Sequence, residues 1–268
     1  MTLISRNKFL SIFCITILIF ILLIFSSFLI NLFMGKIDTF PNPIISNSLT
    51  VKTFIFSSIS LFSIIAISFL GLYPLICGLL IKYSFGKTQA SEIMYFVGFL
   101  FGCLLELLRL FIPILNLWNS FSLFVIVIGK IVFAGRLITI FSFLLASIFP
   151  REVQGHEPER YLIFLTLFSL FFAVFVPVKA GTILDSISPQ TGFSSTFSAI
   201  NISIFIITCI SMFFTDRKEN IFPYILLILG YTFLVYASNF CLLVFGILFL
   251  SFGTFHYLVK IHNYYLWR

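Results

Sequence analysis

Charged side chains are scarce in this sequence. Only 9% of the residues are Asp, Glu, Lys or Arg, whereas 60% are hydrophobic. A soluble domain of ordinary composition has about a quarter of its residues charged. The scarcity of charge therefore excludes an ordinary soluble protein and predicts an integral membrane protein.

Catalytic and metal-binding patterns are also missing. The sequence has no G-x-S-x-G, H-E-x-x-H, P-loop or G-x-G-x-x-G pattern, and its three histidines fall in loops or near the ends of apolar segments. The cysteines lie within apolar segments without C-x-x-C spacing, which argues against a disulfide framework or a zinc site. They are Cys14, Cys77, Cys103, Cys209 and Cys241. We therefore expect no metal and no cofactor, and the sequence favours a protein that is not an enzyme.

Apolar runs of membrane-spanning length are abundant, and they recur from end to end. A helix needs about 20 apolar residues to cross the hydrocarbon core of a bilayer. The runs predict an all-α, polytopic helix bundle of about eight transmembrane helices, with residues 1–268 forming a single integral membrane domain. The predicted spans are 9–33, 54–81, 93–115, 121–149, 161–178, 197–214, 222–237 and 240–259.

The net charge of +7 indicates an orientation in the membrane rather than a nucleic-acid partner. Loops on the cytoplasmic side of membrane proteins carry excess Lys and Arg. With eight spans and a cytoplasmic N-terminus, three cations lie in outside loops, three lie inside spans, and ten lie in inside segments. These ten are Arg6, Lys8, Lys82, Lys87, Arg151, Arg160, Arg217, Lys218, Lys260 and Arg268. The asymmetry predicts a protein of the cell membrane with both termini in the cytoplasm.

Four charged residues interrupt the third and fourth predicted spans. They are Glu106, Arg109, Lys130 and Arg136. A charge at the centre of a membrane helix costs about 3 kcal/mol or more, so such residues usually pair and face protein or water. The four residues are therefore a candidate intramembrane polar cluster. It has two interpretations: an ion-pair network that fixes how the helices pack, or a polar cavity whose excess of cations suits an anion.

The spacing of these residues predicts which of them pair. Glu106 lies twelve residues before Trp118 and Lys130 lies twelve after it. In an antiparallel helical hairpin that turns at Trp118, both would lie about 18 Å from the turn. We therefore expect a Glu106–Lys130 ion pair with Arg109 as a second partner, and we expect Arg136 to extend toward the cytoplasmic interface.

Two glycines precede Glu106 on the same helical face. Gly98 and Gly102 form a G-x-x-x-G pair, a spacing that lets another membrane helix approach closely. Their alignment with the only acid inside a predicted span indicates that this face is packed against protein.

Three classes of function remain. The sequence favours a non-enzymatic membrane module that senses, scaffolds or assembles with other membrane proteins. The alternative is a transporter or binder of a small anionic or amphipathic solute, or of an anionic lipid head group, that uses the charged cluster. An intramembrane enzyme is disfavoured, because no nucleophile–base pair stands out. The lipid bilayer is the one partner that all three classes share, and no nucleic acid is expected.

Overall fold

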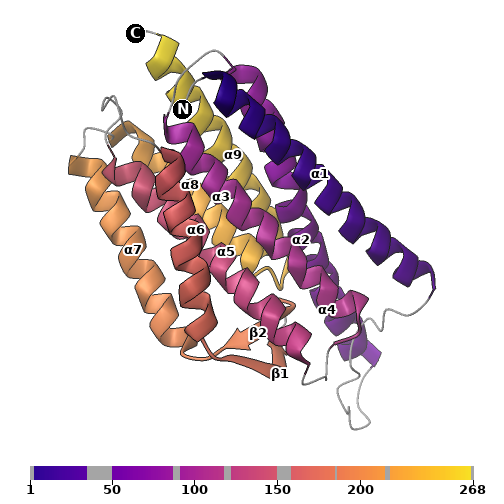
Figure 1. Ribbon diagram of the computed structural model, residues 1–268. Coiled ribbons are helices and arrows are strands. Elements are labelled where there is room, and N and C mark those ends of the chain that lie inside the picture. Colours follow the sequence, from indigo (N-terminus) through magenta and orange to yellow (C-terminus); the bar gives the residue numbers. More distant parts are fainter. Residues whose placement is uncertain are drawn as a thin grey trace.

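The computed structural model describes residues 3–34, 50–86, 91–117, 122–149, 158–184, 186–214 and 218–266, which form a bundle of helices with a β-hairpin at one end (Figure 1). The helices are α1 (Leu3–Phe33), α2 (Thr50–Ser84), α3 (Ser91–Leu105), the 3-10 helix η1 (Glu106–Leu110), α4 (Phe111–Ile114), α5 (Leu123–Ile148), α6 (Pro158–Phe175), α7 (Ser194–Phe214), α8 (Lys218–Val235) and α9 (Phe240–Leu266). The hairpin consists of β1 (Val178–Leu184) and β2 (Ser188–Thr191).

The helices follow the predicted spans. Among the described residues, seven helical segments are long and apolar enough to cross a membrane, and α3, η1 and α4 together make one of them (Glu92–Ile114). The eighth predicted span corresponds to α8, whose apolar part, Ile221–Val235, is shorter than a full crossing. The structure thus confirms a helix bundle with seven membrane-spanning candidates, and an eighth crossing stays a prediction.

The bundle is all-α, as predicted, and the two-stranded hairpin is a small addition to it that was not predicted. The strands pair antiparallel, with Val178 opposite Thr191 and Leu184 opposite Ser188. Pro177 lies between the end of α6 and the start of β1, where its missing amide N–H and fixed φ suit a break in the helix. The sequence predicts only a polar loop in this region, because two short strands leave a weak pattern beside long apolar runs.

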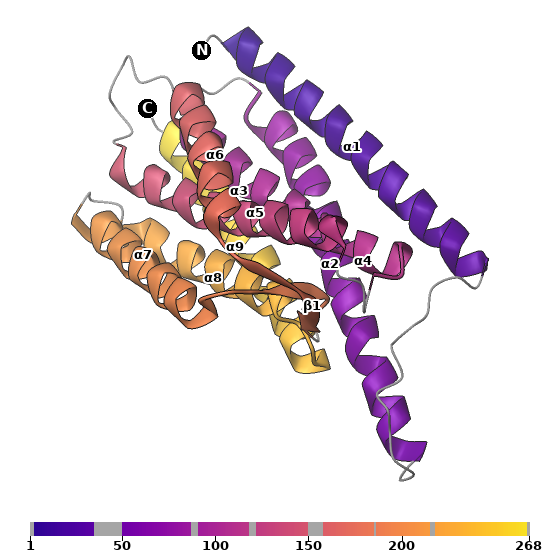
Figure 2. The ribbon, with the colours of Figure 1, turned by 60° about the horizontal axis from the view of Figure 1, so that its bottom comes forward.

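The centre of the bundle is α3. In the segment Glu92–Ile114, which begins with α3, 78% of the most apolar 18-residue stretch is buried, whereas the same measure for α7 is 11%. Helices α2 and α5 pack against α3, and α1, α6 and α7 lie at the periphery (Figures 1 and 2). The peripheral helices expose large apolar side chains such as Leu22, Phe171 and Ile207. Extensive apolar surface of this kind marks an interaction with a membrane or with other proteins.

The start of α1, the end of α2 and the end of α9 lie at one end of the bundle (Figures 1 and 2). Arg6 donates a hydrogen bond to the carbonyl of Phe85, and the Phe85 ring contacts His262 edge-on with ring centroids 5.5 Å apart. We call this end of the bundle the termini end. The hairpin lies at the opposite end (Figure 1).

Reporter fusions can test the orientation that the charge asymmetry predicts. We expect fusions after residues 86 and 218 to report cytoplasm, and a fusion at residue 187, in the hairpin turn, to report the exterior. The physical reason is the excess of Lys and Arg in the segments at the termini end. An exterior signal after residue 86 would contradict this orientation.

Candidate functional site

The candidate site begins where the central helix α3 gives way to the 3-10 helix η1. At Glu106 the chain passes from α3 into η1, a 3-10 helix with three residues per turn. Side chains at positions i and i+3 eclipse in this geometry, so Glu106 and Arg109 project from the same side. Arg109 Nη1 lies 2.9 Å from Glu106 Oε2. The local helix geometry therefore builds the first ion pair of the site.

The Glu106 carboxylate is saturated with hydrogen bonds. Its side chain is completely buried, and Oε1 accepts from Arg136 Nε at 2.8 Å and from the Tyr231 hydroxyl at 3.1 Å. Oε2 accepts from Arg109 Nη1 at 2.9 Å and from Arg136 Nη2 at 3.4 Å. An ionised carboxylate offers about four lone-pair sites. All of them are used, so Glu106 is a structural acceptor with no capacity left for a ligand.

Arg109 connects three separate parts of the chain. Its side chain is 1% exposed. Besides Glu106, it donates from Nε to the carbonyl of Ile187 and from Nη1 to the carbonyl of Val235, both at 3.3 Å. Ile187 lies in the hairpin turn and Val235 is the last residue of α8, where a carbonyl lacks a partner within its helix. A cation at this position also complements the negative end of the helix dipole.

Arg136 is the partly accessible member of the network. Its side chain is 17% exposed, and its guanidinium lies 5.8 Å from the centre of the Tyr236 ring in a cation–π arrangement. Nε and Nη2 bind Glu106, whereas Nη1 has no hydrogen-bond partner among the described residues. Arg136 thus turns inward to Glu106 instead of extending toward the membrane interface, which corrects the prediction for this residue.

Lys130 does not belong to this network. Its Nζ donates to the carbonyl of Val174 at 2.7 Å, near the end of α6, so the structure replaces the predicted Glu106–Lys130 pair with the pair Glu106–Arg136. Lys130 and Arg136 are six positions apart, which places them about 120° apart around α5. Depth alone therefore misidentified the partner. In addition, helical side chains lean toward the N-terminus of their helix, which brings Arg136 down to the level of Glu106.

Gly98 and Gly102 lie where α3 meets α5. A Cβ atom on Gly102 would lie 2.6 Å from the carbonyl oxygen of Gly135 and 2.4 Å from a methyl of Thr139. A Cβ atom on Gly98 would lie 2.6 Å from the hydroxyl of Ser142. At Gly102 only glycine permits this approach, because the atoms that a Cβ would meet there include the backbone of α5. The approach positions Glu106, one turn beyond Gly102, within reach of Arg136.

Two aromatic residues of the site were not predicted from the sequence. Tyr231 donates to Glu106, and Tyr236 covers Arg136. A tyrosine hydroxyl buried in an apolar helix needs a hydrogen-bond partner, and this requirement is the sequence signal that could have singled out Tyr231. The sequence does not indicate which partner it finds, because Tyr231 and Glu106 are 125 positions apart.

A cavity of about 390 Å³ adjoins the network between α5, α7 and α8. Three of its lining residues contact the network directly. Tyr231 binds Glu106, Tyr236 covers Arg136, and the Thr139 hydroxyl donates to the carbonyl of Arg136 at 2.6 Å. Asn201 of α7 adds a buried side-chain oxygen with no hydrogen-bond partner in the described part of the chain, and most of the other walls are apolar. We call this the α5/α7/α8 pocket.

Comparison with other proteins adds no assignment to this geometry. The chain matches no protein-family model, and no curated protein and no solved structure is significantly similar to it. Within the described ranges, no group of three or more His, Cys, Asp or Glu side chains is arranged to hold a metal ion. The site is therefore interpreted from its own chemistry: a saturated ion-pair network beside an apolar pocket.

Proposed function

We propose that this chain is a multi-pass protein of the cell membrane that binds a small amphipathic anion or an anionic lipid in the α5/α7/α8 pocket. The observation that carries this proposal is the shared wall between the pocket and the charged network, formed by Thr139, Tyr231 and Tyr236. Ligand sites are typically concave, mostly apolar cavities of about 300–1,000 Å³ with a few polar groups that fix orientation. The pocket agrees with this description in size and in composition.

The charge of the network favours an anion. It combines two guanidinium groups with one carboxylate, which leaves one net positive charge. Glu106 is saturated and Arg109 is enclosed, so Arg136 is the member with an accessible surface and an uncommitted N–H group. In a low-dielectric interior a charge–charge attraction is much stronger than in water. An amphipathic molecule would place its apolar body against the pocket walls and its anionic end at the wall formed by Thr139 and Tyr236, behind which Arg136 lies.

A non-enzymatic module for sensing, scaffolding or assembly is the second candidate. The observation that favours it is the completeness of the Glu106 network, in which the protein's own groups hold α5, α8, η1 and the hairpin together. The two candidates differ in one property, whether the pocket binds an anion. In both, we propose one domain over residues 1–268, eight crossings and cytoplasmic termini.

Matched ligands and variants can test the pocket. We expect decanoate to raise the melting temperature of the purified protein in a neutral detergent more than decanol does, because only decanoate carries a charge for Arg136. At ten times its Kd a ligand stabilises the native state by about 1.4 kcal/mol. Ile202→Trp should abolish the effect, because Ile202 lines the pocket. The matched control is Ile206→Trp, one turn further along α7, exposed and outside the pocket lining.

Two outcomes would contradict the binding proposal. One is equal stabilisation by decanoate and decanol, which would show that the site does not recognise charge. The other is an unchanged decanoate response in Ile202→Trp, which would place binding elsewhere. Either outcome would favour the module for sensing, scaffolding or assembly.

A further inference from the structure

A second and larger hollow lies between α2 and α9, away from the charged network. Its volume is about 1150 Å³. Its lining extends from Phe69 on α2 to Gly86, two residues beyond the end of α2, and along α9 from Ser251 to Asn263. We call it the α2/α9 groove. It shares no lining residue with the α5/α7/α8 pocket, so the two cavities are separate sites.

The groove has the length of a lipid chain. From Phe69 to Ser84, α2 rises about 22 Å at 1.5 Å per residue. Half of the hydrocarbon core of a bilayer is about 15 Å thick. The groove therefore extends through the depth of one leaflet and on to the level of the head groups.

Polarity changes along the groove. Its walls are apolar over most of their length, with Ile76, Leu80 and Leu258 among them. The polar side chains in this part include Tyr73, Ser251 and Thr254. The hydroxyls of Tyr73 and Thr254 share a hydrogen bond of 2.7 Å, and Thr254 also donates to the carbonyl of Leu250. This part of the groove consequently offers hydrocarbon contact and leaves these two hydroxyls little capacity for a polar ligand.

Polar side chains line the termini end of the groove. His262 Nδ1 is buried and has no hydrogen-bond partner within the described ranges. The side chains of Ser84 and Asn263 line the same end, are exposed, and have no partner among the described residues. Tyr83, beside them, is 92% exposed, as expected of an aromatic residue at the membrane interface. Hydroxyl, amide and imidazole groups together form a donor set that suits a phosphate.

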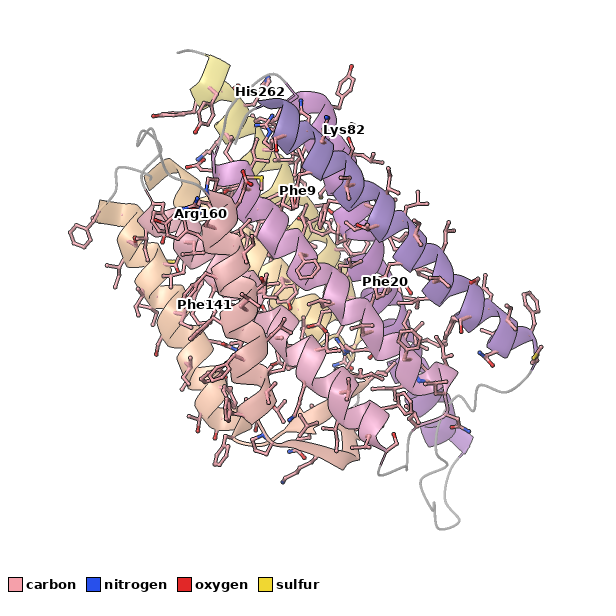
Figure 3. All side chains as sticks on the ribbon, in the orientation of Figure 1. Phe9, Phe20, Lys82, Phe141, Arg160 and His262 are labelled. Atoms are coloured by element: carbon pink, nitrogen blue, oxygen red, sulfur yellow. The ribbon has the colours of Figure 1, made fainter. Side chains whose placement is uncertain are left out.

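Positive charge surrounds this end of the bundle. Lys82 and His262 both lie there (Figure 3). Among the residues with described side chains, the cations at this end outnumber the acids; they are Arg6, Lys8, Lys82, Arg160 and Lys260, against Glu92 and Glu159. Juxtamembrane cations attract anionic lipids near the membrane surface. The field at this end therefore favours an anionic head group over a zwitterionic one.

We infer that the α2/α9 groove holds one anionic phospholipid of the bilayer. An acyl chain lies along α2 and α9, and the phosphate accepts hydrogen bonds from Ser84, His262 and Asn263. The chain length, the change in polarity and the surrounding charge all select this occupant. The lipid fills the groove between two helices that end at the same side of the membrane, and it bridges them there.

Native mass spectrometry of the full chain in detergent tests this inference, with dioleoyl phosphatidylglycerol as the probe. We expect the wild type to retain one phosphatidylglycerol, and Ser251→Trp, which fills the groove, to lose it. Ser203→Trp is the matched control, because Ser203 is an exposed serine on α7 outside both cavities. His262→Ala combined with Asn263→Ala should weaken binding about tenfold without blocking the groove.

Two further probes distinguish recognition of the phosphate from recognition of the acyl chains. Dioleoylglycerol, which lacks the phosphate, should bind at least tenfold more weakly, and glycerol phosphate, which lacks the chains, should not bind. The inference is overturned by equal retention of phosphatidylglycerol in Ser251→Trp and Ser203→Trp, or by equal binding of dioleoylglycerol. It is also overturned by a dimer that Ser251→Trp dissociates, which would make a second copy of the chain the occupant. The double variant keeps the test decisive where Ser251→Trp does not fold.

Discussion

Glu106→Gln should destabilise the detergent-solubilised protein by about 3–5 kcal/mol, the range for breaking a buried ion pair from one side. The carboxylate is completely buried and compensates two arginines, one of which is 1% exposed. The variant keeps the size of the side chain and removes the charge, so Arg109 remains as an uncompensated cation in the interior. The measurement is the free energy or temperature of unfolding, followed by circular dichroism or by loss of monodisperse protein.

Lys130→Met is the matched control for this prediction. Lys130 lies on the next helix at a similar depth, and its side chain donates a hydrogen bond to the carbonyl of Val174. A typical hydrogen bond contributes about 0.5–1.5 kcal/mol, so Lys130→Met should cost about 1 kcal/mol. If Lys130→Met proved as damaging as Glu106→Gln, the partner assignment in the network would be wrong.

A double-mutant cycle then examines the coupling within the network. Glu106→Gln and Arg109→Met should be less than additive, because the second change removes the cation that the first leaves unpaired. The same cycle with Lys130→Met should be additive within about 0.5 kcal/mol, the value for independent sites. Additivity in both cycles would show that Glu106 and Arg109 do not interact.

The sequence predicted the helices well because the bilayer imposes a simple rule. Each apolar run is either long enough to cross or not, and seven of the eight predicted segments meet that rule in the structure. Polar segments of irregular length carry no comparable rule. The hairpin at Val178–Thr191 was therefore missed, although its turn supplies the Ile187 carbonyl that Arg109 binds.

The site was predictable in part for a similar reason. The cost of an intramembrane charge singles out four residues without any structure: Glu106, Arg109, Lys130 and Arg136. Their partners depend on helix rotation and on which helices are neighbours, and the residue spacing fixes neither. Lys130 lies at a similar depth to Glu106 but on a different face of α5, and it binds the carbonyl of Val174 instead. Tyr231 reaches Glu106 from α8, which contacts α3 and α5 through the ring pairs Phe99–Tyr231 and Phe143–Tyr224.

Gly102→Val should destabilise the protein by about 3 kcal/mol, at the upper end of the usual penalty for overpacking. The atom nearest to a new Cβ, apart from a Thr139 methyl, is the carbonyl oxygen of Gly135 at 2.6 Å. A backbone atom cannot rotate away, so α3 and α5 would have to separate. Because Glu106 lies one turn beyond Gly102, separation would also lengthen its hydrogen bonds to Arg136. Unfolding in detergent provides the measurement.

Alanine at each of the two glycines separates helix spacing from side-chain crowding. A Cβ atom on Gly98 meets the ends of two side chains, Ser142 and Leu162, which can shift, whereas a Cβ atom on Gly102 meets backbone. Alanine also gains about 1 kcal/mol of helix propensity over glycine at either position. We therefore expect Gly98→Ala to be close to neutral and Gly102→Ala to remain destabilising. Equal effects at both positions would show that the carbonyl of Gly135 does not set the distance between the helices, and the contact between Glu106 and Arg136 would then need a different physical cause.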